Sequence, residues 1–150
     1  MIISPKKTKS MVISKDPTRC KLEVDNKIFQ QKRSISYLGV LMHSYGDTGA
    51  EVSQQVKKAN RIAGCLKYTI WCNTHLRTET KPKIYRTVIR PIMTYTTETR
   101  PGTTRTKRLM QTCEMKIVRD ITGKSLWDRQ RSIDPRQRCN IENINGWTLK

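Results

Sequence analysis

Two cysteines and a histidine lie close together near the middle of the chain, at Cys65, Cys72 and His75. Thiolate and imidazole are ligands that Zn²⁺ prefers, and a site here would need a fourth ligand such as His43 or Cys139. No CxxC pair anchors such a set, so the spacing does not favour zinc. The five cysteines are odd in number and widely spaced, which predicts reduced thiols rather than a disulfide framework.

Carboxylates are the other groups whose spacing could support catalysis. Nucleotidyl transfer by two metal ions needs carboxylates on neighbouring strands, and the chain contains no Asp-Asp dipeptide. Glu23 and Asp25 would share a strand face, but beside Leu22 and Val24 they are better interpreted as its solvent side. A Gly-rich phosphate loop, a GxSxG turn and an HExxH helix are also absent from the sequence. We therefore assign no catalytic residue and no metal ligand.

Positive charge is the strongest signal in the composition. Lysine and arginine number 30 against 12 aspartates and glutamates, a net charge of +18 at pH 7. Such an excess predicts a polyanionic partner, and nucleic acid is favoured over an anionic membrane. No apolar run approaches the roughly 18 residues of a membrane span, and the first residues lack the apolar stretch of a signal peptide. We expect an intracellular protein that does not bind membranes.

The pattern of the first 45 residues predicts β-structure. Short apolar runs and period-two alternation indicate strands, with a turn at Asp25-Asn26-Lys27 inside the second region. The three expected strand regions are 11–13, 22–29 and 35–42. Gly39 lies at the centre of the third, and Gly46-Asp47 indicates a boundary.

From Glu51 onward the apolar spacing lengthens to three and four residues, which predicts an amphipathic helix. Its buried stripe is expected at Val52, Val56, Ala59, Ala63 and Leu66. Lys57, Lys58 and Arg61 lie off this stripe.

Two further helices are expected. One starts at Pro82 and breaks or kinks at Pro91, because proline removes a backbone donor. It should bury Ile84, Tyr85, Val88 and Ile89. After a Thr-rich loop at 96–106, the other ends near Gly123. Its stripe is Leu109, Cys113, Ile117 and Ile121.

Beyond Gly123 a basic stretch precedes Ile141, Ile144 and Trp147, which are at helical spacing. The predicted fold class is α+β, with a small antiparallel hairpin region followed by a helical bundle. The predicted divisions are 1–45, 46–123 and 124–150.

The order of these pieces resembles the carboxy-terminal part of LINE-type (non-LTR) reverse transcriptases. The segments that carry the resemblance are KTKSMV, YLGV, KKANRIAGCL, KIYRTVIRPIMTY and EMKIVRDITG. They cover nearly the whole chain in the order of the family. The resemblance implies that residues 1–45 form the edge of the polymerase palm, 46–123 the helical thumb and 124–150 a truncated basic tail. A missing palm would leave Ile3, Met11 or Ile13 partly exposed.

The resemblance also assigns roles to basic and hairpin residues. Tyr37, Leu38, Gly39 and Val40 would form the primer grip, the hairpin that holds the primer strand near its growing end. Lys7 and Lys9 would belong to a palm segment beside the nucleotide site. Lys57, Lys58 and Arg61 would face the backbone of an RNA–DNA or DNA duplex. For each group, solvated charge or ordinary strand structure is the alternative interpretation.

The family's catalytic aspartates have no counterpart here, so the chain is expected to start inside a domain and to lack polymerase activity alone. The full-length parent enzyme would use Mg²⁺, but no cofactor is expected in this chain. Two alternatives stay open: a free-standing basic RNA- or DNA-binding protein, and a retroelement remnant without function.

Overall fold

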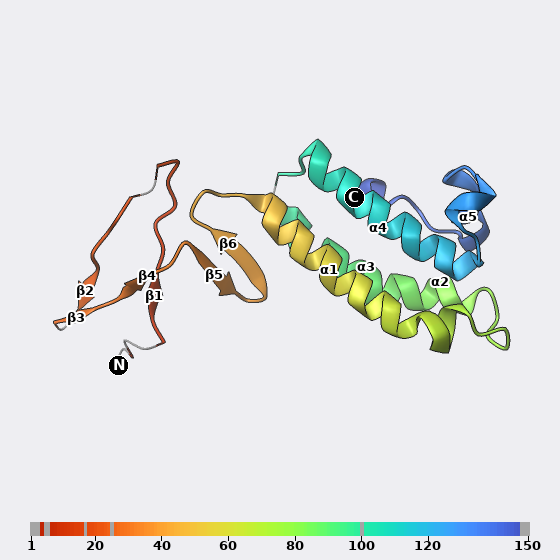
Figure 1. The fold of residues 1–150 in the computed structure, drawn as a ribbon, viewed down its shortest axis with the longest axis horizontal. Helices are drawn as coiled ribbons and strands as arrows, with labels where there is room; N and C mark the ends of the chain where they lie inside the picture. The colour runs from red at the N-terminus through yellow and green to blue at the C-terminus, as the bar shows by residue number, and fades with distance from the viewer. Residues whose placement is uncertain (1–3, 5–6, 17, 25, 100, 148–150) are drawn as a thin grey trace. The chain divides into compact units, whose positions relative to one another are not determined.

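The structure is a computed structural model that describes residues 4, 7–16, 18–24, 26–99 and 101–147. The chain divides into two compact units, Met1–Glu51 and Val52–Lys150. Figure 1 shows short strands in the first unit and helices in the second. The predicted α+β class is therefore confirmed at the level of a mixed fold with small sheets and several helices.

The first unit contains three two-stranded sheets. Lys9–Ser10 (β1) pairs in parallel with Gln30–Gln31 (β4), and the other two sheets are antiparallel hairpins. The hairpin strands are Glu23–Val24 (β2) with Lys27–Ile28 (β3), and Ser34–Tyr37 (β5) with Val40–His43 (β6). The expected turn between β2 and β3 is confirmed at Asn26, whose φ is 56°. Asp25 lies outside the described residues.

The third expected strand is wrong as a single strand, because the chain reverses in its middle. Tyr37 pairs with Val40 across a two-residue turn, and Leu38 and Gly39 both have positive φ, 48° and 81°. Two successive positive φ values are typical of the tight turn whose twist matches that of a hairpin. The apolar pattern continues through the turn, so alternation alone did not reveal it.

Little of the first unit is buried. Phe29 is the one hydrophobic side chain below 9% exposure among its described residues. Met11–Ile13 forms no strand, contrary to expectation, and Met11 is half-buried while Ile13 is 64% exposed. Leu22 and Val24 are exposed alongside Glu23, so β2 has no buried face of the kind that alternation predicts. Ile3 lies outside the described residues.

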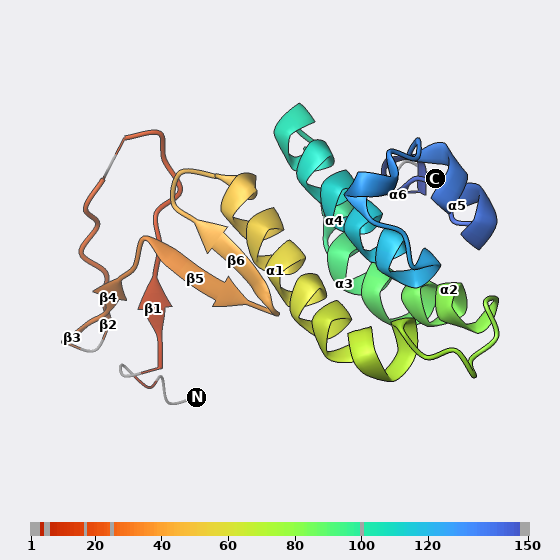
Figure 2. The same cartoon turned by 45° about the vertical axis from the view of Figure 1, so that its right-hand side comes forward.

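The second unit is helical, and Figure 2 shows its helices side by side. The α-helices are Thr48–Leu66 (α1, which begins just before the division), Thr80–Ile84 (α2), Arg90–Thr94 (α3), Thr104–Thr122 (α4), Ile133–Cys139 (α5) and Ile144–Trp147 (α6). Wider π-helical turns follow α1 at Lys67–Trp71 and join α2 to α3 at Tyr85–Ile89. Short 3-10 turns lie at Thr97–Thr99 and Leu126–Asp128.

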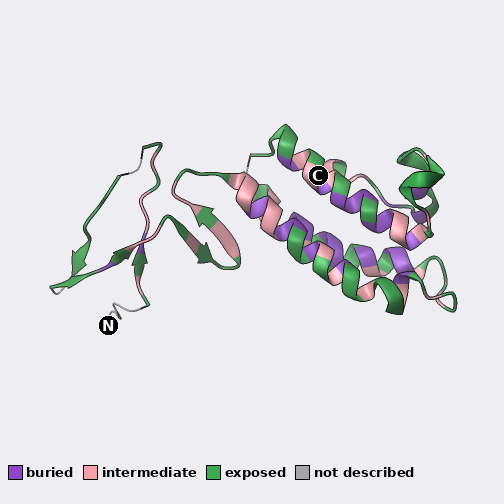
Figure 3. Cartoon of the chain, in the orientation of Figure 1, coloured by how far each residue is buried: buried purple, intermediate pink, exposed green. Residues whose placement is uncertain are grey.

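The stripe predicted for α1 is confirmed, since Val52, Val56, Ala59 and Ala63 are buried in the core and Leu66 packs against it. Figure 3 shows buried positions recurring along α1, with exposed positions between them. This spacing follows from the helical repeat of 3.6 residues. The core continues through Tyr85, Ile89 and Met93 to α4.

The helical run through α2 and α3 differs from its prediction at its start and at Val88. It starts at Thr80 rather than Pro82, and at Pro91 it is not broken but continues to Thr94. Pro91 is the second residue of α3, which directly follows the π-helical turn, where the regular i to i−4 bonding of the helix is already interrupted. Val88 is 42% exposed rather than buried, because the π-helical turn moves it off the face that carries Tyr85 and Ile89.

Helix α4 begins earlier than predicted, inside the expected loop at 96–106. Thr103 starts it, because its side-chain oxygen accepts a hydrogen bond from the backbone N–H of Thr106 at 3.2 Å. Gly123 ends it at φ 65°, as expected for a residue free of Cβ strain. Cys113, Ile117 and Ile121 are buried along its length, and Leu109 is partly buried.

Residues after Gly123 pack on the helices. α5 and α6 both contact α4, and Cys139, Ile141 and Ile144 are each at most 5% exposed. The side chain of Trp147 lies outside the described residues. No helix in the described residues is both long and apolar enough to span a membrane.

Candidate nucleic-acid interface

The face of α1 opposite its buried stripe is basic. Lys57, Lys58 and Arg61 are exposed, while their neighbours Val56 and Ala59 are buried. Residues three and four apart lie on one side of a helix, so the three cations share a face. All three residues are exposed, so their side chains could contact phosphate oxygens.

Helix α1 leads directly into the π-helical turn at Lys67–Trp71. Lys67 is exposed there, and Tyr68 is 82% exposed. An exposed tyrosine beside cations is a combination that can contact a nucleobase or sugar as well as phosphate. We call Lys57, Lys58 and Arg61 the α1 basic face.

Other cations serve the fold instead. The ammonium of Lys81 is buried and donates a hydrogen bond to the backbone oxygen of Trp71 at 2.8 Å. Arg86 donates to the backbone oxygens of Cys139 at 3.3 Å and Asn140 at 2.7 Å. Part of the positive charge is therefore committed to holding the carboxy-terminal segment in place.

Glu114 is the centre of a buried ionic cluster. Its side chain is 0% exposed in the middle of α4, and it lies between two arginines. Arg90 Nη2 is 3.4 Å from Glu114 Oε1, and Arg136 Nη2 is 2.7 Å from Glu114 Oε2. The hydroxyl of Tyr85 and the backbone N–H of Ile144 donate to the same carboxylate at 3.1 Å and 3.2 Å. We call Glu114, Arg90, Arg136 and Tyr85 the Glu114 cluster.

The cluster joins four segments of the second unit. Arg90 also donates to the backbone oxygen of Glu142 at 2.7 Å and lies over the Tyr85 ring, 5.4 Å from its centroid. Burial raises the pKa of Tyr85 above its ordinary value, and the nearby Glu114 carboxylate raises it further. The tyrosine therefore stays neutral as a hydrogen-bond donor.

One position in the sequence indicates this cluster. Glu114 falls on the apolar stripe of α4, four residues after Met110 and three before Ile117. A carboxylate at such a position is rarely buried unless it is paired. Its partners come from segments 24 residues before and 22 residues after it, so the spacing alone could not name them.

The thiols fall into two groups. Cys20, Cys65 and Cys72 are exposed, whereas Cys113 and Cys139 are buried. Burial raises the pKa of Cys113 to about 11 and also raises the pKa of Cys139. No group of three or more His, Cys, Asp or Glu side chains within the described ranges is arranged to hold a metal ion.

The remaining site residues suggested by the sequence belong to the first unit. Lys7 and Lys9 are exposed near β1. At the β5–β6 turn Tyr37 is 63% and Leu38 is 73% exposed, Gly39 is exposed and Val40 is half-buried. These residues thus form an exposed hairpin tip, separate in the chain from the α1 basic face of the second unit.

Comparison with known proteins adds no relative. No protein-family model, no curated protein and no solved structure matches this chain.

Proposed function

We propose that this chain binds the sugar-phosphate backbone of nucleic-acid duplexes, as the primer-grip and thumb part of a LINE-type reverse transcriptase. The α1 basic face is the observation that carries the proposal. One side of α1 is buried in the hydrophobic core, and the basic residues lie on its exposed side. The packing of the helix therefore holds their backbone positions fixed. Phosphate contacts of this kind give affinity with little sequence preference.

The distribution of charge supports the same function. Residues 52–150 contain 21 of the 30 lysines and arginines but only 7 of the 12 acidic residues. One of those acids, Glu114, is buried between arginines and contributes nothing to the surface. The surface of the second unit is therefore strongly positive, as a polyanion-binding surface requires.

The hairpin supports a role at a strand end. A residue with a side chain larger than glycine rarely adopts positive φ, yet Leu38 does so at 48° while its side chain is largely exposed. Exposed apolar residues elsewhere in this unit, at Ile13, Leu22, Val24 and Ile28, provide a surface that a neighbouring domain of a polymerase could cover.

The direct test is a titration of the full chain with an RNA–DNA duplex and a DNA duplex at several salt concentrations. If roughly six phosphates are neutralised, affinity falls about a thousandfold between 50 and 200 mM salt. The slope of log affinity against log salt concentration reports the number of phosphate contacts, at about 0.9 per contact. Replacing Lys57, Lys58 and Arg61 together by Gln should reduce this slope by the contribution of up to about three contacts.

The matched control replaces Lys83, Arg131 and Arg138 by Gln, which removes the same charge from other exposed positions. This control should alter the slope less than the triple substitution on α1. Equal effects of the two variants would show that net charge, not the α1 basic face, governs binding. An unchanged slope in the α1 variant would reject the proposed role of those three residues.

A further inference from the structure

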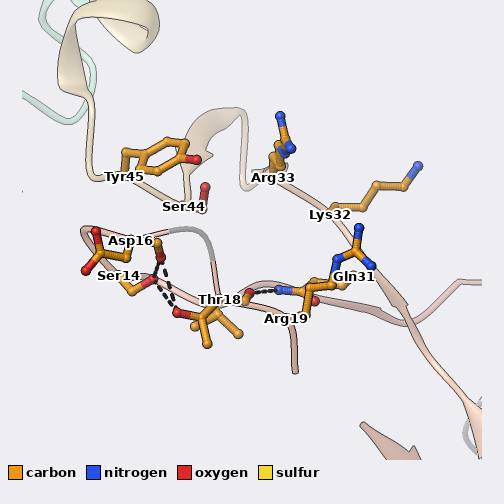
Figure 4. A pocket seen from close by; sticks show the side chains of 10 residues that line it. Ser14, Asp16, Thr18, Arg19, Gln31, Lys32, Arg33, Ser44 and Tyr45 are labelled. Atoms are coloured by element: carbon orange, nitrogen blue, oxygen red, sulfur yellow. Dashed lines mark hydrogen bonds between the residues drawn. The ribbon is translucent and has the colours of Figure 1, made fainter. Parts of the chain in front are cut away.

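The first unit contains a polar pocket that the proposed duplex surface does not use. Its volume is about 530 Å³. The residues that line it include Asp16, Thr18, Arg19, Lys32, Arg33, Ser44 and Tyr45. Figure 4 shows that these side chains come from three separate segments of the unit.

Hydrogen bonds fix the three segments around the pocket. The side-chain amide of Gln31 donates to the backbone oxygen of Thr18 at 2.8 Å and accepts from the backbone N–H of Cys20 at 3.1 Å. The backbone N–H of Ser14 donates to the oxygen of Ser44 at 3.0 Å, and the N–H of Ser44 donates to the oxygen of Arg33 at 2.9 Å. The loop before β2, the end of β4 and the end of β6 are thereby held together.

The lining carries an excess of positive charge. The lining contains three cations, Arg19, Lys32 and Arg33, and one carboxylate, Asp16. Within the described part of the chain, none of these three cations forms an ion pair. Guanidinium groups match the oxygens of a phosphate in geometry, and hydroxyls such as those of Ser44 and Tyr45 can donate to the same oxygens.

Size narrows the class of ligand. A pocket of about 530 Å³ lies within the range of about 300–1,000 Å³ that is usual for small-molecule sites. That volume exceeds what a lone phosphate needs. The ring of Tyr45, which is 54% exposed, also lines the pocket and offers a flat apolar surface for a base or sugar.

We propose that this pocket binds a terminal phosphate monoester attached to a nucleoside. The phosphate contacts Arg19, Lys32 and Arg33, and the nucleoside lies against Tyr45. A free mononucleotide and the 5′-phosphorylated end of a strand present the same chemistry. The site does not depend on the α1 basic face, because all of its residues belong to the first unit.

Calorimetric titration of the full chain at constant ionic strength tests the site. The probes are deoxyadenosine monophosphate, inorganic phosphate and deoxyadenosine. We expect the nucleotide to bind at least about tenfold more tightly than the nucleoside. The reason is that its phosphate interacts with three basic side chains, and a tenfold difference corresponds to about 1.4 kcal/mol of binding free energy. Inorganic phosphate should bind more weakly than the nucleotide.

A double substitution, Arg19→Gln with Arg33→Gln, should weaken nucleotide binding at least about tenfold. The control is Lys15→Gln with Lys27→Gln, which removes the same charge from exposed positions outside the pocket. It should change the affinity less than twofold on the same scale, about 0.4 kcal/mol. Equal binding of nucleotide and nucleoside, or equal effects of the two variants, would overturn the proposal.

Two further measurements distinguish a free nucleotide from a phosphorylated strand end, and the pocket from the α1 basic face. Tighter binding of a 5′-phosphorylated oligonucleotide than of its 5′-hydroxyl form, with loss of the difference in the pocket variant, identifies a strand end. Binding of the free nucleotide without that difference identifies the nucleotide itself. The triple substitution on α1 should leave nucleotide binding unchanged, so failure of the pocket and failure of the duplex surface give different results.

Discussion

Glu114 shows how one buried carboxylate can organise a strongly basic chain. Removing a carboxylate from water costs several kcal/mol, and only charged partners and further hydrogen bonds offset that cost. Here Arg90 and Arg136 supply the charges, and the Tyr85 hydroxyl and the Ile144 N–H supply the further bonds. The cluster fixes where the carboxy-terminal residues pack on α4, because Arg136 and Ile144 both belong to that segment.

The first prediction concerns this carboxylate. Glu114→Gln keeps the shape of the side chain but leaves two arginines without their counter-charge, so the free energy of unfolding should fall by about 3–5 kcal/mol. Urea denaturation followed by circular dichroism measures the loss. The control is Glu98→Gln, the same change at an exposed position, which should alter stability by less than about 0.5 kcal/mol. A loss below about 1 kcal/mol for Glu114→Gln would contradict the cluster.

Cysteine reactivity is the second residue-scale prediction. The thiolate is the reactive form, and a pKa of about 11 keeps Cys113 protonated at neutral pH. In a disulfide-exchange assay at pH 7.5, Cys20, Cys65 and Cys72 should react quickly and the two buried cysteines slowly. All five should react in denaturant. Because the raised pKa favours the protonated thiol, the slow reaction of Cys113 should accelerate as the pH rises towards 11. Fast reaction of all five thiols in the native protein would contradict the burial of Cys113 and Cys139.

At the scale of elements, the helices were more predictable than the strands. The stripe of α1 followed from residue spacing, because helical burial repeats over many residues and one misplaced side chain does not obscure it. Two-residue strands offer no such repetition. The apolar pattern did not indicate the turn at Leu38, because a leucine with positive φ is uncommon, and only Gly39 and the resemblance to a primer-grip hairpin pointed to a reversal there.

The sequence also could not predict irregular helical turns or the contacts between residues far apart in the chain. The exposure of Val88 depends on a π-helical turn that no residue pattern indicated. For the candidate site, the sequence placed Lys57 and Arg61 correctly on the exposed side of α1. It did not distinguish them from Lys81 or Arg90, which are buried, because which lysines and arginines serve the fold depends on tertiary contacts.

The third prediction tests the β5–β6 hairpin. Gly39→Val places a β-branched residue at φ 81°, a conformation that such residues almost never adopt, so the turn should open. Faster amide hydrogen exchange of Val40 and Tyr37 would report the opening. If the hairpin grips a primer end, the variant should also lose preference for recessed over blunt duplexes, while the salt slope stays unchanged.

Leu38→Asn is the matched control, because asparagine tolerates the left-handed conformation better than leucine. It should keep the turn and slow hydrogen exchange there by up to about fivefold, which corresponds to about 1 kcal/mol. If Gly39→Val left both hydrogen exchange and duplex preference unaltered, the hairpin would have no part in binding a strand end.

At the scale of the whole molecule, gripping and catalysis are separable functions. The α1 basic face and the hairpin tip can contact a backbone without any metal ion, because phosphate contacts need only donors and positive charge. Polymerisation needs carboxylates that hold two metal ions beside the primer end. Binding without synthesis is therefore the expected behaviour of this chain.

The last prediction measures both functions in one sample. At low salt, the full chain should shift a primer–template duplex to the bound state and yet extend no primer with Mg²⁺ or Mn²⁺ and all four deoxynucleoside triphosphates. Its basic surface supplies the binding, and its sequence has no Asp-Asp pair to supply the chemistry. An authentic reverse transcriptase in the same buffer shows that the substrate is competent. Primer extension that disappears in Glu23→Gln or Asp25→Asn would mean that these two residues hold the metal ions, and their interpretation as the solvent side of a strand would be wrong. Absence of both binding and extension would reject the duplex-gripping function.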